Sequence, residues 1–289
     1  MFKGLNTALI TPFSNNQVDE MALKKLIESQ IAGEVDSIVV CGTTGESPTL
    51  SHEEHKKVIE LSIKFADKKI KVVAGTGSNS TKEAVDMTNF AKEAGADGCL
   101  IVAPYYNKPT AEGIYQHFAE LDKCGIPLIV YNIPGRSVIN ITDENIAKMA
   151  ELENIVAIKD ATGDLSRIAS LRALIKKDFC YLSGEDETIV GFNAMGGHGI
   201  ISVTSNIAPK ICKELQNHCV QGDYNKARQV QDKLLELNQA MFCETNPIPV
   251  KYAAHLCGLS EEDIRLPLCQ ASETTKTRIE KALKNLDLI

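Results

Sequence analysis

A single lysine, Lys159, stands near the end of an otherwise apolar run, IVAIKD, that covers residues 155–160. Burying a lysine is costly unless the protein uses its amine. Desolvation favours the neutral amine, and a neutral amine attacks a ketone to form an imine. Lys159 is therefore a candidate Schiff-base nucleophile. Two structural alternatives stay open at this point: the side chain could extend to solvent, or it could pair with a carboxylate such as that of Asp160.

Imine chemistry also requires groups that move protons and groups that hold a carboxylate. The hydroxyls of Tyr131, Thr44 and Tyr106 could form a proton relay. Thr43 and Thr44 lie in a glycine-flanked turn, GTTGE, whose hydroxyls and backbone N–H groups can bind an anion. Arg136 offers a planar guanidinium that can hold a second carboxylate through two hydrogen bonds. Each residue alone also has an ordinary structural role, so the prediction depends on their occurrence together.

These residues all follow short apolar runs that recur along the first two-thirds of the chain. The runs begin near residues 4, 37, 71, 98, 127, 155, 179 and 199. Most are continuously apolar, which is typical of parallel strands that are covered on both faces. Amphipathic stretches of helical period, such as MALKKLIESQIA and KEAVDMTNFAKEAG, separate most of them. The sequence therefore predicts alternating strands and helices.

Eight strand–helix units favour a closed barrel over an open doubly wound sheet, which usually has about five or six parallel strands. The rest of the chain has helical period only. We therefore predict an α/β fold: a (β/α)8 TIM barrel in residues 1–225 and a C-terminal helical extension, residues 226–289, packed on the barrel. No Gly/Ser-rich or Pro-rich linker separates the two. In such a barrel the active site lies in the loops after the strands, where the candidate residues are found.

Composition and charge argue against several other classes of protein. The 289 residues carry a formal net charge of −7, with acidic and basic residues mixed along the sequence. Neither nucleic acid nor a membrane surface is favoured as a partner. No run approaches the roughly 18 apolar residues of a membrane span, and the N-terminus does not resemble a signal peptide. We expect a cytoplasmic protein.

Two further features could suggest a metal, a disulfide framework or a nucleotide. The nine cysteines include no C-x-x-C pair, so neither a metal site nor a set of disulfides is predicted. Gly75-Thr76-Gly77 follows an apolar run and could open a dinucleotide-binding loop of a hydride-transfer enzyme. The third glycine of that fingerprint falls on Ser80, and the barrel spacing argues against a dinucleotide-binding domain.

Six segments of the chain resemble, in order, the signature segments of the dihydrodipicolinate synthase family: GTTGES, PYYNKP, YNIPGR, IKDATG, LSGED and ETNPIPVK. The resemblance covers essentially the full chain. The wider family comprises pyruvate-dependent class I aldolases and lyases and includes N-acetylneuraminate lyase. The resemblance implies an enzyme without cofactor or metal that binds pyruvate as a Schiff base on Lys159.

The resemblance also implies roles for the other candidate residues. Thr43, Tyr131 and Tyr106 would form the proton relay, with Tyr106 reaching into the site of a neighbouring subunit. An oligomer is thereby implied, in this family usually a homotetramer that is a dimer of dimers. Thr44 and Ile201 would contact the bound pyruvate. The full set of implied substrate-binding residues is Thr44, Arg136, Ile201, Gly184 and Asn246.

The acceptor substrate is implied by Arg136, which resembles the family residue that binds the carboxylate of L-aspartate 4-semialdehyde. The implied product is 4-hydroxy-tetrahydrodipicolinate, at the first step of the diaminopimelate and lysine branch. Two alternatives remain: a sugar-acid lyase of the same family, in which an arginine here is unusual, and a non-catalytic pyruvate-binding sensor. One departure is Asp160, where many relatives carry glutamate.

A second site, for feedback inhibition by L-lysine, is implied at the start of a predicted helix. Ser51 and Glu54 form a capping-box pattern there, which needs no ligand. His52 and His55 lie three residues apart, but no third metal ligand is evident. In lysine-inhibited members of the family, the residues that line the inhibitor pocket resemble Ser47, His52, His55, Asn79, Glu83 and Tyr105.

Overall fold

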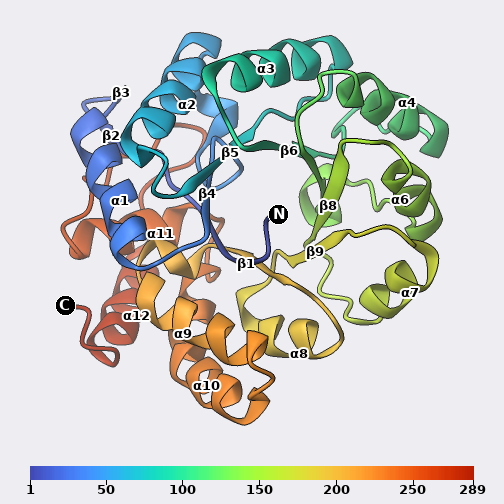
Figure 1. Cartoon of the computed structure of the whole chain (residues 1–289). Coiled ribbons are helices and arrows are strands. Elements are labelled where there is room, and N and C mark those ends of the chain that lie inside the picture. Colours follow the sequence, from blue (N-terminus) through green and yellow to red (C-terminus); the bar gives the residue numbers. More distant parts are fainter.

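The computed structural model describes residues 1–289 and contains a closed barrel of eight parallel strands surrounded by helices (Figure 1). The strands follow the order β1-β10-β9-β8-β7-β6-β5-β4, and β1 pairs with both β10 and β4 to close the barrel. Their bounds are β1 Gly4–Ala8, β4 Ser37–Val40, β5 Lys71–Gly75, β6 Gly98–Val102, β7 Leu128–Asn132, β8 Ile155–Asp160, β9 Cys180–Ser183 and β10 Gly199–Ser202. Each predicted apolar run contains one of these strands, so the predicted TIM barrel is confirmed.

Helices follow the strands in the order that the amphipathic stretches predicted. Those that surround the barrel are α1 Glu20–Ala32, α2 His52–Ala66, α3 Thr81–Ala94, α4 Ala111–Asp122, α6 Asp143–Ala150, α7 Ser166–Leu174, α8 Ile189–Ala194 and α9 Pro209–Val220. Local signals fix several of the helix starts. At α2, for instance, Ser51 and Glu54 form the predicted capping box, with both reciprocal hydrogen bonds present.

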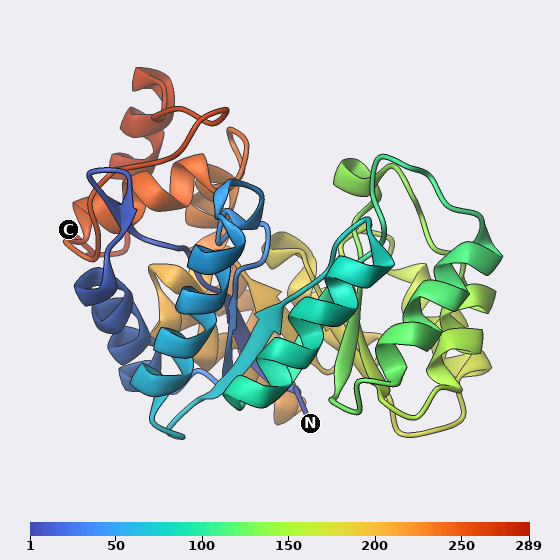
Figure 2. The same cartoon turned by 90° about the horizontal axis from the view of Figure 1, so that it is seen from above.

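The chain continues after the barrel with α10 Tyr224–Met241, α11 Ile248–Leu256 and α12 Glu273–Lys284. Helix α10 packs on α9, α8 and α12, and α11 packs on α12. In Figure 2 the red helix α12 lies toward one end of the barrel and the N-terminus lies at the other. A division between residues 225 and 226 would cut α10, so we propose that the C-terminal segment begins at the turn before it, residues 221–223.

Several small elements were not expected from the sequence. Strands β2 Phe13–Ser14 and β3 Gln17–Val18 form a short antiparallel hairpin after β1. A four-residue helix, α5 Pro134–Ser137, follows β7. Single turns of 3-10 helix occur at η1 Ser47–Thr49, η2 Asp186–Thr188 and η3 Thr204–Asn206. These pieces are too short to give a periodic signal, and α5 and η1 carry candidate site residues.

The apolar core has two layers, as the alternation of side chains along a strand requires. An inner cluster of eleven buried residues lies within the barrel and includes Tyr131, Ala157, Leu182 and Ile201. A larger cluster fills the space between the strands and the helices. Since both faces of each strand are covered, the strands are continuously apolar. None of the helices combines the length and the apolar character that crossing a membrane would need.

Candidate active site

Lys159 lies at the C-terminal end of β8 and is 6% exposed. Ala157, two residues earlier on the same face of the strand, belongs to the inner cluster, so Lys159 also faces the barrel interior. Its register partner on β7 is Tyr131. The Lys159 Nζ lies 4.4 Å from the centre of the Tyr131 ring. The amine therefore lies at the mouth of the barrel, beside the phenol that was predicted to belong to the proton relay.

The pairing of Lys159 with Asp160, left open by the sequence, does not occur. The Asp160 carboxylate is 3.2 Å from Arg167 Nε and accepts hydrogen bonds from Asn132 Nδ2 at 3.3 Å and Thr162 N at 3.0 Å. Asp160 thus faces the helices, as expected for the residue next to an inward-facing one. Lys159 makes no ion pair with any carboxylate in the chain and no hydrogen bond. Its amine is therefore available to react with a ligand.

The Lys159 side chain has room where it lies because residue 184, which follows β9, is a glycine. A Cβ at this position would lie 2.7 Å from Ala161 Cβ and 3.1 Å from Lys159 Cε. Any larger residue would therefore press on the lysine side chain. The next residue, Glu185, has its pKa raised by burial, and the nearby charge of Lys159 opposes part of that rise. Gly184 therefore lies beside the Lys159 side chain, and its role in substrate binding stays a prediction.

The turn after β4 places Thr43 and Thr44 above the barrel. Glu46 N donates to Thr43 O at 3.1 Å, and Ser47 N donates to Gly42 O at 3.3 Å, so the turn is closed on itself. Thr44 is buried, and its Oγ1 accepts a hydrogen bond from Asn246 Nδ2 at 3.0 Å. Because the oxygen is used as an acceptor, the Thr44 hydroxyl proton remains free to be donated to a ligand.

Asn246 links this turn to the loop after β7, which carries Arg136. The Arg136 Nη2 donates to the Asn246 backbone oxygen at 3.0 Å. The remaining guanidinium N–H groups are open to solvent and to a ligand. The Asn246 Oδ1 is buried and has no hydrogen-bond partner in the chain. The structure thus brings together Thr44, Arg136 and Asn246, which come from three distant parts of the sequence.

Two predicted residues have different surroundings. Ile201 lies on β10 inside the barrel, in the same inner cluster as Tyr131. Tyr106 is 88% exposed, has a left-handed backbone with φ of 70°, and makes no hydrogen bond with Tyr131 or Thr43. The single chain therefore brings Thr43 and Tyr131 to the barrel mouth but leaves the third member of the predicted relay outside it.

The residues predicted to bind L-lysine lie in the segments that follow β4, β5 and β6. Ser47 is in η1, His52 and His55 are at the start of α2, Glu83 is at the start of α3, and Asn79 and Tyr105 are in loops. His52 Nε2 lies 2.7 Å from Glu83 Oε1, and Ser78 Oγ donates to Glu83 Oε2 at 2.5 Å. Burial, together with the charge of Glu83, raises the pKa of the Tyr105 phenol.

The other three predicted residues, His55, Asn79 and Ser47, make different interactions. His55 Nε2 is 2.8 Å from Gly75 O, which makes its ring a structural link. Asn79 contributes its backbone oxygen to Asn107 Nδ2 at 2.9 Å, and its own side chain stays uncommitted. Ser47 opens the 3-10 turn after the threonine turn. Of the six residues, His52 and Glu83 are in direct contact, and Asn79 is hydrogen-bonded to the loop that carries Tyr105.

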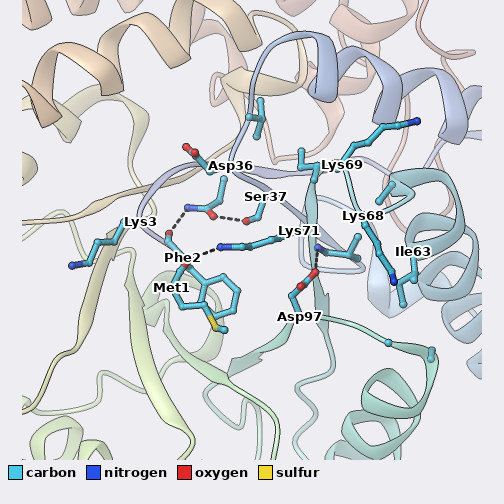
Figure 3. A pocket seen from close by; sticks show the side chains of 17 residues that line it. Met1, Phe2, Lys3, Asp36, Ser37, Ile63, Lys68, Lys69, Lys71 and Asp97 are labelled. Carbon is cyan, nitrogen blue, oxygen red and sulfur yellow. Dashed lines mark hydrogen bonds between the residues drawn. The ribbon is translucent and has the colours of Figure 1, made fainter.

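A cavity of about 840 Å³ lies around the N-terminus, at the other end of the strands (Figure 3). Its polar groups are largely used within the protein: Lys71 Nζ donates to Met1 O at 3.0 Å, and Asp97 Oδ2 accepts from Val72 N at 2.8 Å. The candidate residues are absent from its lining. Since barrel enzymes place their chemistry at the carboxyl ends of the strands, we assign no catalysis to this cavity.

One buried pair near the site was missed by the sequence reasoning. Lys251 of α11 lies 2.5 Å from Glu46, which directly follows the threonine turn, and both side chains are 1% exposed. Lys251 carries the same signal as Lys159, a lone lysine in an apolar run, here IPVKYAA. Its partner stands 205 residues away in the sequence, so only the fold reveals the pair.

Fold and site together define a (β/α)8-barrel protein with an unpaired, buried lysine at the barrel mouth, an arrangement suited to Schiff-base chemistry. The model of the dihydrodipicolinate synthetase family matches residues 1–286. The chain belongs to this family, as its sequence segments predicted.

Known relatives are similar over the full length. The chain is 51% identical over 290 residues to the 4-hydroxy-tetrahydrodipicolinate synthase of Parvibaculum lavamentivorans, and the match covers 100% of both proteins. The chloride-inhibited dihydrodipicolinate synthase of Acinetobacter baumannii, solved with pyruvate, has a TM-score of 0.98 at 43% identity, covering 100% of both chains. The enzyme of Cyanidioschyzon merolae, solved with lysine bound, has a TM-score of 0.97 at 36% identity, covering 100% of this chain and 99% of that one.

Proposed function

We propose that the chain condenses pyruvate with L-aspartate 4-semialdehyde to give 4-hydroxy-tetrahydrodipicolinate, the first step of the diaminopimelate and lysine branch. The observation that carries this proposal is Lys159: a buried amine, unpaired, at the mouth of a barrel and 4.4 Å from the Tyr131 ring. Similarity to a named synthase over the whole length supports the same reaction.

The reaction begins when the amine of Lys159 attacks the ketone carbon of pyruvate. The resulting carbinolamine loses its hydroxyl as water, which leaves an imine between Nζ and the former ketone carbon. A proton then leaves the methyl group, and the imine becomes an enamine. Tyr131 lies beside Nζ and passes these protons, together with Thr43. Thr44, with its hydroxyl proton free, donates to the pyruvate carboxylate.

The enamine carbon next attacks the aldehyde carbon of the semialdehyde, whose carboxylate is bound by Arg136. The amino group of the acceptor then attacks the imine carbon and closes the ring. Transimination releases Lys159 as a free amine. Atoms balance, because the single water formed in the imine step is the only other product.

The exposed position of Tyr106 supports an oligomer as the active species. In the single chain this tyrosine reaches no member of the relay, although its exposed ring is free to enter another subunit. We propose that Tyr106 completes the relay of a neighbouring subunit. The proposed assembly is the homotetramer, a dimer of dimers, that the family resemblance implies.

The test of the proposed reaction is consumption of pyruvate by the pure protein, with L-aspartate 4-semialdehyde in one cuvette and N-acetylmannosamine in another. Consumption with the semialdehyde alone is expected. Consumption with the sugar alone would instead assign the chain to the sugar-acid lyases and remove Arg136 from the acceptor site. A protein that binds pyruvate but turns over with neither acceptor would be a sensor.

We also propose that L-lysine inhibits the enzyme by binding beside Glu83, between the segments that follow β4, β5 and β6. The Glu83 carboxylate provides the negative charge for the ammonium group of the ligand, and His52 lies beside it. The side chain of Asn79 is free to accept a further hydrogen bond. The dihydrodipicolinate synthase of Cyanidioschyzon merolae, solved with lysine bound, supports such a site.

Replacement Glu83→Gln is expected to raise the concentration of L-lysine needed for half inhibition about tenfold or more, because a charge-assisted hydrogen bond contributes about 1.5–3 kcal/mol. The KM for pyruvate should stay unchanged, since Glu83 lies in the first turn of α3 and is not among the residues proposed to bind pyruvate. Glu53→Gln, which changes an exposed residue of α2, is the matched control. Equal inhibition of Glu83→Gln and the wild type would place the lysine site elsewhere.

A further inference from the structure

The turn that carries Thr43 and Thr44 is fastened to the C-terminal segment at two points. Asn246 Nδ2 donates to Thr44 Oγ1 at 3.0 Å, and Lys251 Nζ lies 2.5 Å from Glu46 Oε1. Asn246 and Lys251 are five positions apart, and Lys251 N donates to Pro247 O at 3.0 Å in the first turn of α11. One compact piece of the C-terminal segment therefore holds the turn at Thr44 and at Glu46.

The pair formed by Glu46 and Lys251 is deeply buried. Taking both charges out of water costs several kcal/mol, which their attraction repays only when geometry and hydrogen bonds are favourable. Both partners are well placed: the other Glu46 oxygen accepts from Arg265 N at 3.2 Å. Lys251 Nζ and Arg265 Cζ lie 4.2 Å and 4.1 Å from the centre of the Phe13 ring. Such a pair gives little net stability, so its main consequence is a fixed geometry.

The backbone of Glu46 gives independent support for a geometric role. Its φ of 53° is in the left-handed region, which is unfavourable for a residue with a Cβ and is normally occupied by glycine. The conformation lets Glu46 N donate to Thr43 O while Glu46 O accepts from Thr49 N at 3.0 Å. The sequence thus keeps a charged residue where glycine would be easier, and the side chain is anchored to α11.

The same C-terminal piece also touches the acceptor side of the site. Arg136 Nη2 donates to Asn246 O at 3.0 Å. The position of the guanidinium and the position of the Thr44 hydroxyl are therefore set by opposite ends of one asparagine. Neither Glu46 nor Lys251 contacts Lys159 or lies in the inner cluster, so they can influence the reaction only through these neighbours.

We propose that Glu46 and Lys251 are positioning residues, through which the C-terminal helical segment sets the geometry of the pyruvate-binding turn. The role attributed to the turn depends on the proposed function; the anchoring itself does not. In this view α11 is part of the catalytic apparatus of the barrel. Loss of the pair should loosen residues 42–47 and slow formation of the imine on Lys159, while the nucleophile itself stays intact.

The test is the double variant Glu46→Gln/Lys251→Met, which removes both charges and leaves no unpaired ion in the interior. We expect the variant to fold and to form the borohydride-trapped pyruvate imine about tenfold or more slowly at low pyruvate concentration. Its KM for pyruvate should rise, and its KM for the semialdehyde should change much less. Amide exchange of residues 42–47, measured without substrate, should become about tenfold faster. Lys213→Met, which breaks the ion pair with Asp36 at the other end of the barrel, is the matched control.

Each outcome bears on the proposal. Wild-type trapping rates together with unchanged exchange in the turn would overturn the positioning role while leaving the proposed reaction in place. Absence of trapping in the wild type would overturn the reaction, and the exchange measurement would still test the anchoring. If the double variant does not fold, Phe13→Leu replaces it, because this change keeps both charges and loosens only their common support. Unchanged trapping and exchange in Phe13→Leu would then count against the proposal.

Discussion

Replacement Lys159→Ala is expected to abolish trapping of pyruvate by borohydride and to lower kcat by about 10⁴-fold or more, since loss of a covalent nucleophile removes the whole reaction path. No other group in the site can take over, because the neighbouring Tyr131 phenol cannot form an imine. The measurement is the mass of the intact protein after reduction with pyruvate present. The wild type should gain one reduced pyruvate unit per chain, and the variant none.

Two controls make this result specific. Lys159→Arg keeps a long basic side chain but lacks an amine that forms an imine, so it should also fail to trap pyruvate. Lys71→Ala removes a lysine at the opposite end of the barrel, where Nζ donates to Met1 O, and should trap as the wild type does. A normal adduct in Lys159→Ala would assign the nucleophile to another lysine, and peptide mapping would identify it.

Much of the fold could be predicted from the sequence because a strand inside a parallel barrel is buried on both faces. The run 155–160 illustrates this: Ala157 packs inside the barrel and Ile158 packs against the helices, so apolar residues follow one another without alternation. Lys159 breaks this pattern, and the break identified it as a candidate. The hairpin β2–β3 gave no such signal, since each of its strands has only two residues.

The candidate site could be predicted only in part, because some of its relations join distant segments. The residue types of Thr44 and Arg136 suggested ligand binding, and the family resemblance implied Asn246. Their mutual contacts, however, depend on where the chain returns after the barrel. Lys251 shows the limit more sharply. An apolar run around a lysine predicts that the side chain is buried. The carboxylate that pairs with it, Glu46, can be identified only from the tertiary structure. Tyr106 marks a further limit: it is 88% exposed, so nothing around it in the single chain tests its predicted role in a neighbouring subunit.

Replacement Arg136→Ala is expected to raise the KM for L-aspartate 4-semialdehyde and to lower kcat/KM for it by about 100-fold. The reason is loss of a charge-assisted, two-pronged contact with the acceptor carboxylate, worth about 3 kcal/mol. Steady-state kinetics with the semialdehyde as the varied substrate measure this effect. Trapping of pyruvate by borohydride should change little, because Lys159 and Tyr131 remain in place.

Comparing the effect of Arg136→Ala on semialdehyde kinetics with its effect on imine formation from pyruvate shows how Arg136 acts. Arg136 also donates to Asn246 O, so its loss could act indirectly by moving Asn246 and, through it, Thr44. An indirect effect would slow imine formation with pyruvate as well, whereas a direct contact would leave it unchanged. Arg136→Lys, which keeps the charge without the fork, should fall between the wild type and alanine, and Arg228→Ala on α10 should match the wild type. Unchanged kinetics with the semialdehyde in Arg136→Ala would remove Arg136 from the acceptor site and leave specificity to the loops around it.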